Sequence, residues 1–243
     1  MNTNTDMHIA GCGNIPAGEY NNISISGSGK LLGKVRCESF SCSGSGHGES
    51  IECKEWFKVS GASSFSGDIK VGSGKISGAL SCGGNIVADT AFHCYGSTHC
   101  AQNLKGNSIS AAGTLKVGGD IEAEEVQIKG AITCEGLLNA EDIEIRFDKK
   151  LDIGGIGGSK IVISHERNRK KLFRLFSRSK REKARGAVAS SIEGDEISLE
   201  SVACPRVAGR IVTIKKGCNI DLVQYSENVE ISPNAKVGKT EKI

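Results

Sequence analysis

Proline and aromatic residues are scarce in this sequence. Its 243 residues include 3 prolines and one tryptophan, and aromatic side chains make up 5% of the chain. A core of the usual globular kind, built on large aromatic side chains, is therefore not expected. Glycine, by contrast, occurs 32 times without a Gly-X-Y period, which indicates many tight corners.

Long apolar runs are also lacking. No stretch approaches the roughly 18 apolar residues that span a bilayer, and residues 1–6 have neither the basic start nor the apolar run of a signal peptide. We therefore expect a soluble, cytoplasmic protein. Its ten cysteines would suit a disulfide framework in a short secreted chain, but here a long apolar repeat supplies the stability.

That repeat runs from Ile23 to Ile145. Apolar residues lie two and, in most units, four places before a glycine, and these anchor glycines step by 17, 17, 17, 18, 17 and 17 residues: Gly27, Gly44, Gly61, Gly78, Gly96, Gly113 and Gly130. A fixed period of this size marks an architecture in which each unit buries its apolar face only against its neighbours.

Two more apolar pairs follow each anchor glycine, as Leu115 and Val117 and then Ile121 and Ala123 illustrate. Every pair has the two-residue alternation of a half-buried β-strand, and none extends to helical spacing. Three short strands separated by Gly or Ser corners in about 17 residues describe one turn of a triangular parallel β-helix. A second glycine six places after many anchors predicts a tight or positive-φ bend there.

The expected organisation is one all-β solenoid with an interruption. A short tail occupies residues 1–8, the β-helix residues 9–165, and a basic, partly helical or disordered insert residues 166–190. Alternating apolar pairs then resume at Ile197, so residues 191–243 are expected to continue the β-helix. About 12 turns at the ~4.8 Å strand spacing would make a rod of about 55–60 Å.

The segment from His93 to Cys100 looks at first like a zinc site, because it holds two Cys and two His within nine residues. Strand alternation instead points Cys94 and Cys100 inward and His93 and His99 outward, so the four cannot converge on one metal. Inward cysteines recur in the repeat, where a small, soft side chain suits a narrow core. Cys82 and Cys100 share a column on adjacent turns, where a disulfide is sterically conceivable; in a reducing compartment we expect thiols.

Signs of catalysis are missing from the pattern. Glycine-rich segments such as Gly27 to Lys30 resemble phosphate loops, but each leads into a strand, without the helix whose N-terminus would hold a phosphate. The five histidines show no nucleophile–base arrangement. We therefore expect no enzyme, no cofactor, no metal site and no small-molecule substrate.

The basic insert is the feature that a structural rod does not require. Residues 165–185 carry ten Lys or Arg against two Glu, a net charge of +8, whereas the rest of the chain carries −5. Four bulky apolar residues lie among these charges, a composition typical of a peripheral membrane anchor. A solvated loop and the binding of nucleic acid or another acidic partner are the alternatives. The candidate binding residues are Arg167, Arg169, Lys170, Lys171, Leu172, Phe173, Arg174, Leu175, Phe176, Arg178, Lys180 and Arg181.

The strand-and-glycine signature resembles that of the bactofilins, bacterial polymer-forming cytoskeletal proteins with a right-handed triangular β-helix. The likeness covers roughly Met7 to Ile145 and lies in segments such as Ile23-Ser-Ile-Ser-Gly-Ser-Gly29 and Val126-Gln-Ile-Lys-Gly130. It implies nucleotide-independent filaments formed through the ends of the rod, association with the inner face of the cell membrane, and scaffold roles in cell shape, envelope synthesis or motility.

The chain departs from the bactofilin pattern in three ways. It lacks long proline-rich tails, it carries the basic insert inside the solenoid, and its strands continue to Val237. The expected partners are other copies of the chain, an anionic membrane surface, and cytoskeletal or envelope proteins; nucleic acid is the least favoured. A non-polymerising adaptor that binds an acidic partner through the insert is the alternative function, and an acyl- or sugar-processing β-helix enzyme is the least favoured one.

The first prediction concerns the basic insert. Replacing Leu172, Phe173, Leu175 and Phe176 with serine should abolish flotation of the protein with anionic liposomes, because the apolar side chains that enter the interface are lost. Assembly should be intact, and unchanged flotation would remove the membrane hypothesis.

Overall fold

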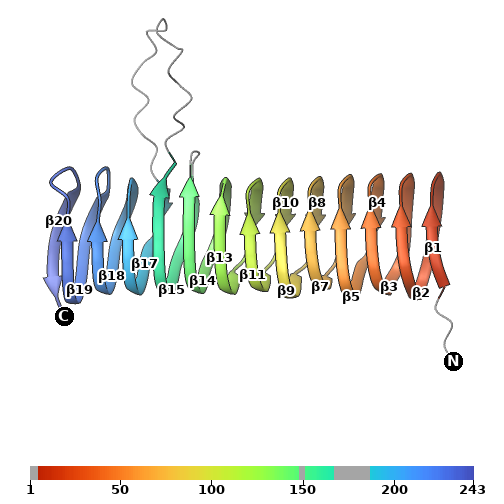
Figure 1. The fold of residues 1–243 in the computed structure, drawn as a ribbon, viewed down its shortest axis with the longest axis horizontal. Helices are drawn as coiled ribbons and strands as arrows, with labels where there is room; N and C mark the ends of the chain where they lie inside the picture. The colour runs from red at the N-terminus through yellow and green to blue at the C-terminus, as the bar shows by residue number, and fades with distance from the viewer. Residues whose placement is uncertain (1–4, 148–150, 167–186) are drawn as a thin grey trace, which may run out of the picture.

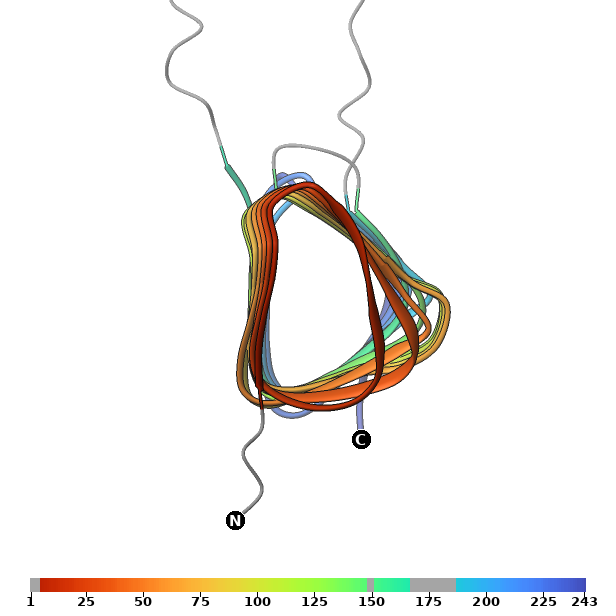
Figure 2. The ribbon, with the colours of Figure 1, turned by 90° about the vertical axis from the view of Figure 1, so that its right-hand side faces the viewer.

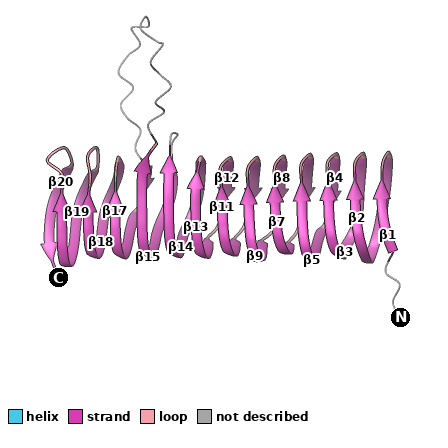
Figure 3. Ribbon diagram, in the orientation of Figure 1, coloured by secondary structure: helices cyan, strands magenta, loops and turns pink. Residues whose placement is uncertain are grey.

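The computed structural model describes residues 5–147, 151–166 and 187–243. They form a single parallel β-solenoid of about 13 turns with about 17 residues per turn, and no helix occurs in these ranges (Figure 3). In Figure 1 the near strands run upward while the chain advances from right to left, which is the sense of a right-handed helix. The predicted all-β solenoid is therefore confirmed, with about one turn more than the 12 expected.

The cross-section is triangular (Figure 2). The strands of the turns are β1 (Thr5–Ile9), β2 (Cys12–Ile25), β3 (Ser28–Cys42), β4 (Ser45–Gly48), β5 (Ser50–Val59), β6 (Ala62–Phe65), β7 (Ile69–Ile76), β8 (Ala79–Cys82), β9 (Ile86–Cys94), β10 (Ser97–Cys100), β11 (Leu104–Ala111), β12 (Thr114–Val117), β13 (Ile121–Lys129), β14 (Ala131–Phe147), β15 (Asp152–His165), β16 (Ala187–Ala189), β17 (Ser191–Leu199), β18 (Val202–Ile214), β19 (Asn219–Ile231) and β20 (Lys236–Lys242).

Three faces repeat along the rod. Face A holds the short strands β4, β6, β8, β10 and β12; face B holds the first half of β5, β7, β9, β11 and β13, and face C the second half. Equivalent residues of successive turns pair directly, as Ser97 does with Ala79 below and Thr114 above. Each face is thus a parallel sheet, and each position of the turn forms a column along the rod.

The inward columns form one continuous core. Phenylalanines are the largest fully buried side chains of the described residues, and three of them cluster in the turns near the N-terminus, where Phe40 and Phe57 stack with ring centroids 4.9 Å apart. Phe65 packs edge-on against both rings. The core continues past residues 167–186, because Ile161 of β15 pairs with Ile197 of β17. The first turn also begins earlier than expected: β1 starts at Thr5, since Met7 pairs with Ile23.

Two corners are fixed by different devices. At the corner between faces C and A, a Cβ on an anchor glycine would overlap the carbonyl oxygen of the turn below, as at Gly78 over Gly61. At the corner between faces A and B, the glycines six places after an anchor glycine were expected to need a positive φ. Of these, only Gly33 has one, with φ of 90°. Several later turns use side-chain oxygens at this corner. Asp68 Oδ1 accepts a hydrogen bond from the backbone N–H of Asn85 at 2.7 Å.

This ladder of side chains continues up the rod. The donors are all backbone N–H groups. The N–H of Asn103 donates to Asn85 Oδ1 at 3.2 Å, and that of Asp120 donates to Asn103 Oδ1 at 2.8 Å. The N–H of Leu137 donates to Asp120 Oδ1 at 2.7 Å. Each bond satisfies a corner N–H that the strands leave without a partner.

The anchor glycines give the second prediction. Gly78→Ala should lower the unfolding midpoint by on the order of 5–10 °C, because the new methyl group forces two stacked backbones apart. Gly11 holds the same position in the first turn, where a Cβ meets nothing within 4 Å. Gly11→Ala is therefore the matched control and should leave the midpoint unchanged in thermal denaturation; equal losses in both variants would contradict the stacking argument.

Candidate assembly surfaces

All residues predicted to bind membrane or an anionic partner, Arg167 to Arg181, lie outside the described residues. The candidate surfaces of the described chain are the two ends of the solenoid and one strip on face C. No helix long and apolar enough to cross a membrane occurs in the described ranges.

The C-terminal end presents an unpaired strand edge. β20 pairs with Asn219–Tyr225 of β19 on faces A and B, whereas Asn228–Ile231 on face C pairs only with β18, on the other side. Ile231 is 40% exposed, and Val229 and Val237 are partly buried against the core. A free edge beside apolar side chains is a template for a further strand.

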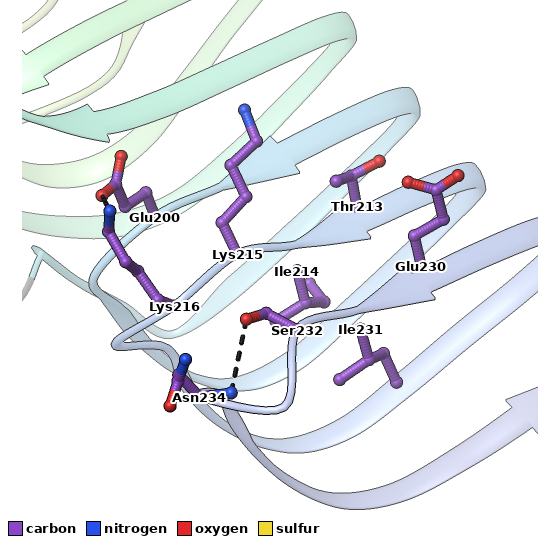
Figure 4. Close-up of a pocket in the computed structure, with 9 residues that line it drawn as sticks. All are labelled: Glu200, Thr213, Ile214, Lys215, Lys216, Glu230, Ile231, Ser232 and Asn234. Atoms are coloured by element: carbon purple, nitrogen blue, oxygen red, sulfur yellow. Dashed lines mark hydrogen bonds and ion pairs between the residues drawn. The ribbon is translucent and has the colours of Figure 1, made fainter.

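A hollow of about 520 Å³ opens at this edge (Figure 4). Two interactions lie along its wall: the Lys216 ammonium and the Glu200 carboxylate form an ion pair of 3.4 Å, and the backbone N–H of Asn234 donates to Ser232 Oγ at 3.3 Å. Lys215 and Glu230 take part in none of the ion pairs found among the described residues, so their charges face solvent. The lining residues are Glu200, Thr213, Ile214, Lys215, Lys216, Glu230, Ile231, Ser232 and Asn234.

The N-terminal end has the complementary shape. β1 covers face C of β2, while residues 12–16 of β2 on face A pair only with β3. Met7 and Ile9 of β1 are partly buried hydrophobics packed against the core. At the N-terminal end of the described solenoid, face C therefore has one strand more than the other two faces. At the C-terminal end of the described solenoid, face C has one strand fewer.

The strip on face C combines cations with aromatic rings. Lys58, Lys75 and His93 follow one another in a single outward column. Lys58 Nζ lies 4.2 Å from the centroid of the Trp56 ring, and Lys75 Nζ lies 5.7 Å from that of Tyr95. We call these five residues the cationic strip.

The cationic strip differs from the charged columns in which the sign alternates, although like charges also stack at Glu125 on Asp142 and at Lys129 on Arg146. On face B, Glu19, Arg36 and Glu52 occupy successive turns, and Arg36 pairs with both carboxylates. Lys58 and Lys75 are neighbours of the same sign, and neither belongs to an ion pair found in the described ranges. Like charges on directly opposed positions repel, so this surface favours a negatively charged partner.

Sequence reasoning missed the cationic strip. Outward positions carry no apolar period, so nothing in the repeat marks them. The spacing to the anchor glycines could have revealed it, because Lys58, Lys75 and His93 each stand three places before such a glycine.

The predicted directions of Cys94, Cys100 and His99 are confirmed, whereas His93 lies in an outward column but is half-buried. Cys94 and Cys100 are fully buried while His99 is exposed, and no group of His, Cys, Asp or Glu in the described ranges is arranged to hold a metal. Burial raises the pKa of Cys134 and of Cys204 to about 11. These two thiols therefore stay protonated near neutral pH.

Comparisons with known proteins add one relative. A segment of 109 residues, 44% of this chain, is 29% identical to an uncharacterised protein of Bacillus subtilis (strain 168), YhbF, and spans 42% of that protein. No family model matches the chain, and no solved structure matches it.

Proposed function

We propose that this protein is a bactofilin-like structural element that assembles end to end into nucleotide-independent filaments and serves as a membrane-associated cytoskeletal scaffold. One observation carries the proposal: the two ends of the described solenoid are complementary. The strand that β1 adds on face C is the strand that the last turn lacks there. Solenoids that stay monomeric cover such ends with polar caps.

Head-to-tail stacking continues the apolar columns without a break. Following the pairing from turn to turn, Val229 belongs to the column of Met7, Ile231 to that of Ile9, and Val237 to that of Ile15. A second copy placed on the C-terminal end would thus pair its β1 with Asn228–Ile231 and cover the exposed Ile231. A heterologous contact of this kind repeats into an open filament.

A contact between two like ends satisfies less of the edge. A two-fold axis exchanges two of the three faces and maps the third onto itself. The extra strand on face C of one copy then lies against a different face of the other copy, where it fills the missing position. The third face meets its own equivalent, and a gap one strand wide remains there. Because unpaired backbone groups are costly to bury, the head-to-tail arrangement is favoured.

Engineered cysteines give the third prediction. His8 and Glu230 are outward residues of one column, so head-to-tail stacking places them side by side. In a background with the exposed Cys12 changed to serine, a mixture of His8→Cys and Glu230→Cys proteins should form a disulfide-linked dimer under mild oxidation. Ser110→Cys, in the same column at mid-rod, is the matched control and should not cross-link.

Each other result has a definite meaning. Cross-linking of His8→Cys alone, or of Glu230→Cys alone, would show contacts between like ends and overturn the head-to-tail arrangement. Electron microscopy of the protein without nucleotide tests the filament itself. Monodisperse monomers across salt and pH, with no cross-link in any mixture, would overturn end-to-end assembly.

A second candidate function is an adaptor that binds an acidic partner. The cationic strip supports it, since two unpaired lysines and two aromatic rings on one flat face suit a negatively charged surface. This function needs no polymer, so it is separable from the first.

The fourth prediction concerns the cationic strip. Lys58→Glu with Lys75→Glu should weaken retention of the protein on an immobilised poly-glutamate surface by about tenfold, because two attractive contacts become repulsive. Lys30→Glu with Lys116→Glu changes the net charge equally and is the control, because both lysines are exposed on face A and take part in none of the ion pairs found among the described residues. Equal losses in both variants would indicate a general charge effect and remove the role of the strip.

A further inference from the structure

Buried cysteines meet in pairs at two places in the core. Cys37 of β3 is the direct partner of Cys53 in β5, and Cys82 of β8 is the direct partner of Cys100 in β10. The Sγ atoms of Cys37 and Cys53 lie 3.1 Å apart. All four side chains are at most 3% exposed.

The other cysteines of the repeat have different neighbours. Cys42 lies opposite Val59, Cys94 opposite Ile76 and Ala111, and Cys134 opposite Val117. They occupy the same narrow core and are equally buried, but none has a second sulfur on the adjacent turn. They serve as internal controls for any chemistry that needs two thiols.

The spacing of the turns suits a covalent bond at both pairs. Directly opposed residues of neighbouring strands are separated by about 4.8 Å, and disulfides join residues whose Cα atoms are about 4.4–6.8 Å apart. At Cys37 and Cys53 the sulfurs need to approach by only about 1 Å to reach the length of about 2.05 Å of an S–S bond. At Cys82 and Cys100 the register brings the two residues directly opposite each other in the same way.

We infer that Cys37–Cys53 and Cys82–Cys100 are two oxidative modification sites, at which exchange with a low-molecular-weight disulfide closes a reversible covalent bond between adjacent turns. The inference does not depend on filament formation. It also differs from the expectation that all cysteines act only as core filler.

The chemistry balances at each site. One thiolate attacks a sulfur of the small disulfide and expels the first small thiolate, which leaves a mixed disulfide on the protein. The second cysteine loses its proton to the expelled thiolate, attacks the mixed disulfide and expels the second small thiolate. Two protein thiols and one small disulfide thus become one protein disulfide and two small thiols.

The interaction within the second pair favours Cys100 as the first nucleophile. Its hydrogen bond with Cys82 lowers the pKa of Cys100, whereas the same hydrogen bond together with burial raises the pKa of Cys82. At the first pair, the hydrogen bond with Cys37 and burial raise the pKa of Cys53. Because all four sulfurs are buried, the small disulfide enters during local opening of a turn.

A bond between turns acts on the contacts that hold a solenoid together. The stability of a repeat rod is approximately a sum of terms within turns and between neighbouring turns. Each bond also closes a short loop in the unfolded chain, which reduces the entropy of that state. Oxidation is therefore expected to stiffen and stabilise the part of the rod from β3 to β10.

Thiol counting tests the inference on the intact protein. After incubation of the native chain with excess oxidised glutathione, followed by denaturation and alkylation, six of the ten thiols should be alkylated because two pairs have reacted, or five where the exposed Cys12 carries glutathione. Peptide mapping should recover the Cys37–Cys53 and Cys82–Cys100 links. The unfolding midpoint should rise by on the order of 5–10 °C and return to its first value after reduction.

Single variants separate the two sites. Cys53→Ala should lose one link and keep the other, whereas Cys94→Ala should keep both. Peptide mapping of the unmodified chain needs no variant, so the test stands even where a substitution impairs folding. Nine or ten alkylated thiols after oxidation, or links that join other cysteines, would overturn the inference.

Discussion

Parallel stacking of every turn on the one before is the interaction on which this molecule depends. Each strand donates to and accepts from the turns on both sides, so the backbone of one turn must retrace that of its neighbour at the strand spacing. At the corner between faces C and A the chains approach so closely that the anchor glycines leave no room for a Cβ. Turn length, corner residues and register all follow from this one requirement.

Stacking also decides where function can reside. Inward positions are committed to the core. In the interior of the rod, the strands have hydrogen-bonding partners on both sides. The outer edge of β1 and the outer edge of Asn228–Ile231 in β19 have no strand partner among the described residues. The outward positions are free of packing constraints, which is why the cationic strip can lie on face C without disturbing the fold.

The period predicted the fold because burial and alternation leave a direct trace in the residue types. Inward Cys94 and outward His93 could be told apart from their offset to Gly96 alone. The ladder from Asp68 to Asp120 could not, since Asn and Asp are common at any corner and their bonds depend on the backbone of the next turn. Met7 and Ile9 stand four and two places before Gly11, which is the spacing of the regular units, so the repeat could have placed the first turn at Met7. Only the extension to the polar Thr5 leaves no trace in the residue types.

Stacking in register has a further consequence, because a residue is placed against its own equivalent. Where the sequence repeats a residue type, the outcome depends on how that type interacts with itself. Phe40 on Phe57 gives a favourable ring stack, Cys37 on Cys53 brings two sulfurs together, and Lys58 on Lys75 sets like charges side by side.

The charged columns show that such repetition is usually avoided. Lys105 lies opposite Glu122 with an ion pair of 2.8 Å, and Arg36 lies between two glutamates. Alternation of sign removes a repulsion that stacking would otherwise impose on every turn. Like charges also meet at Glu125 on Asp142 and at Lys129 on Arg146. The sulfur pairs and the cationic strip are thus among several places where stacking alone does not explain the choice of residue.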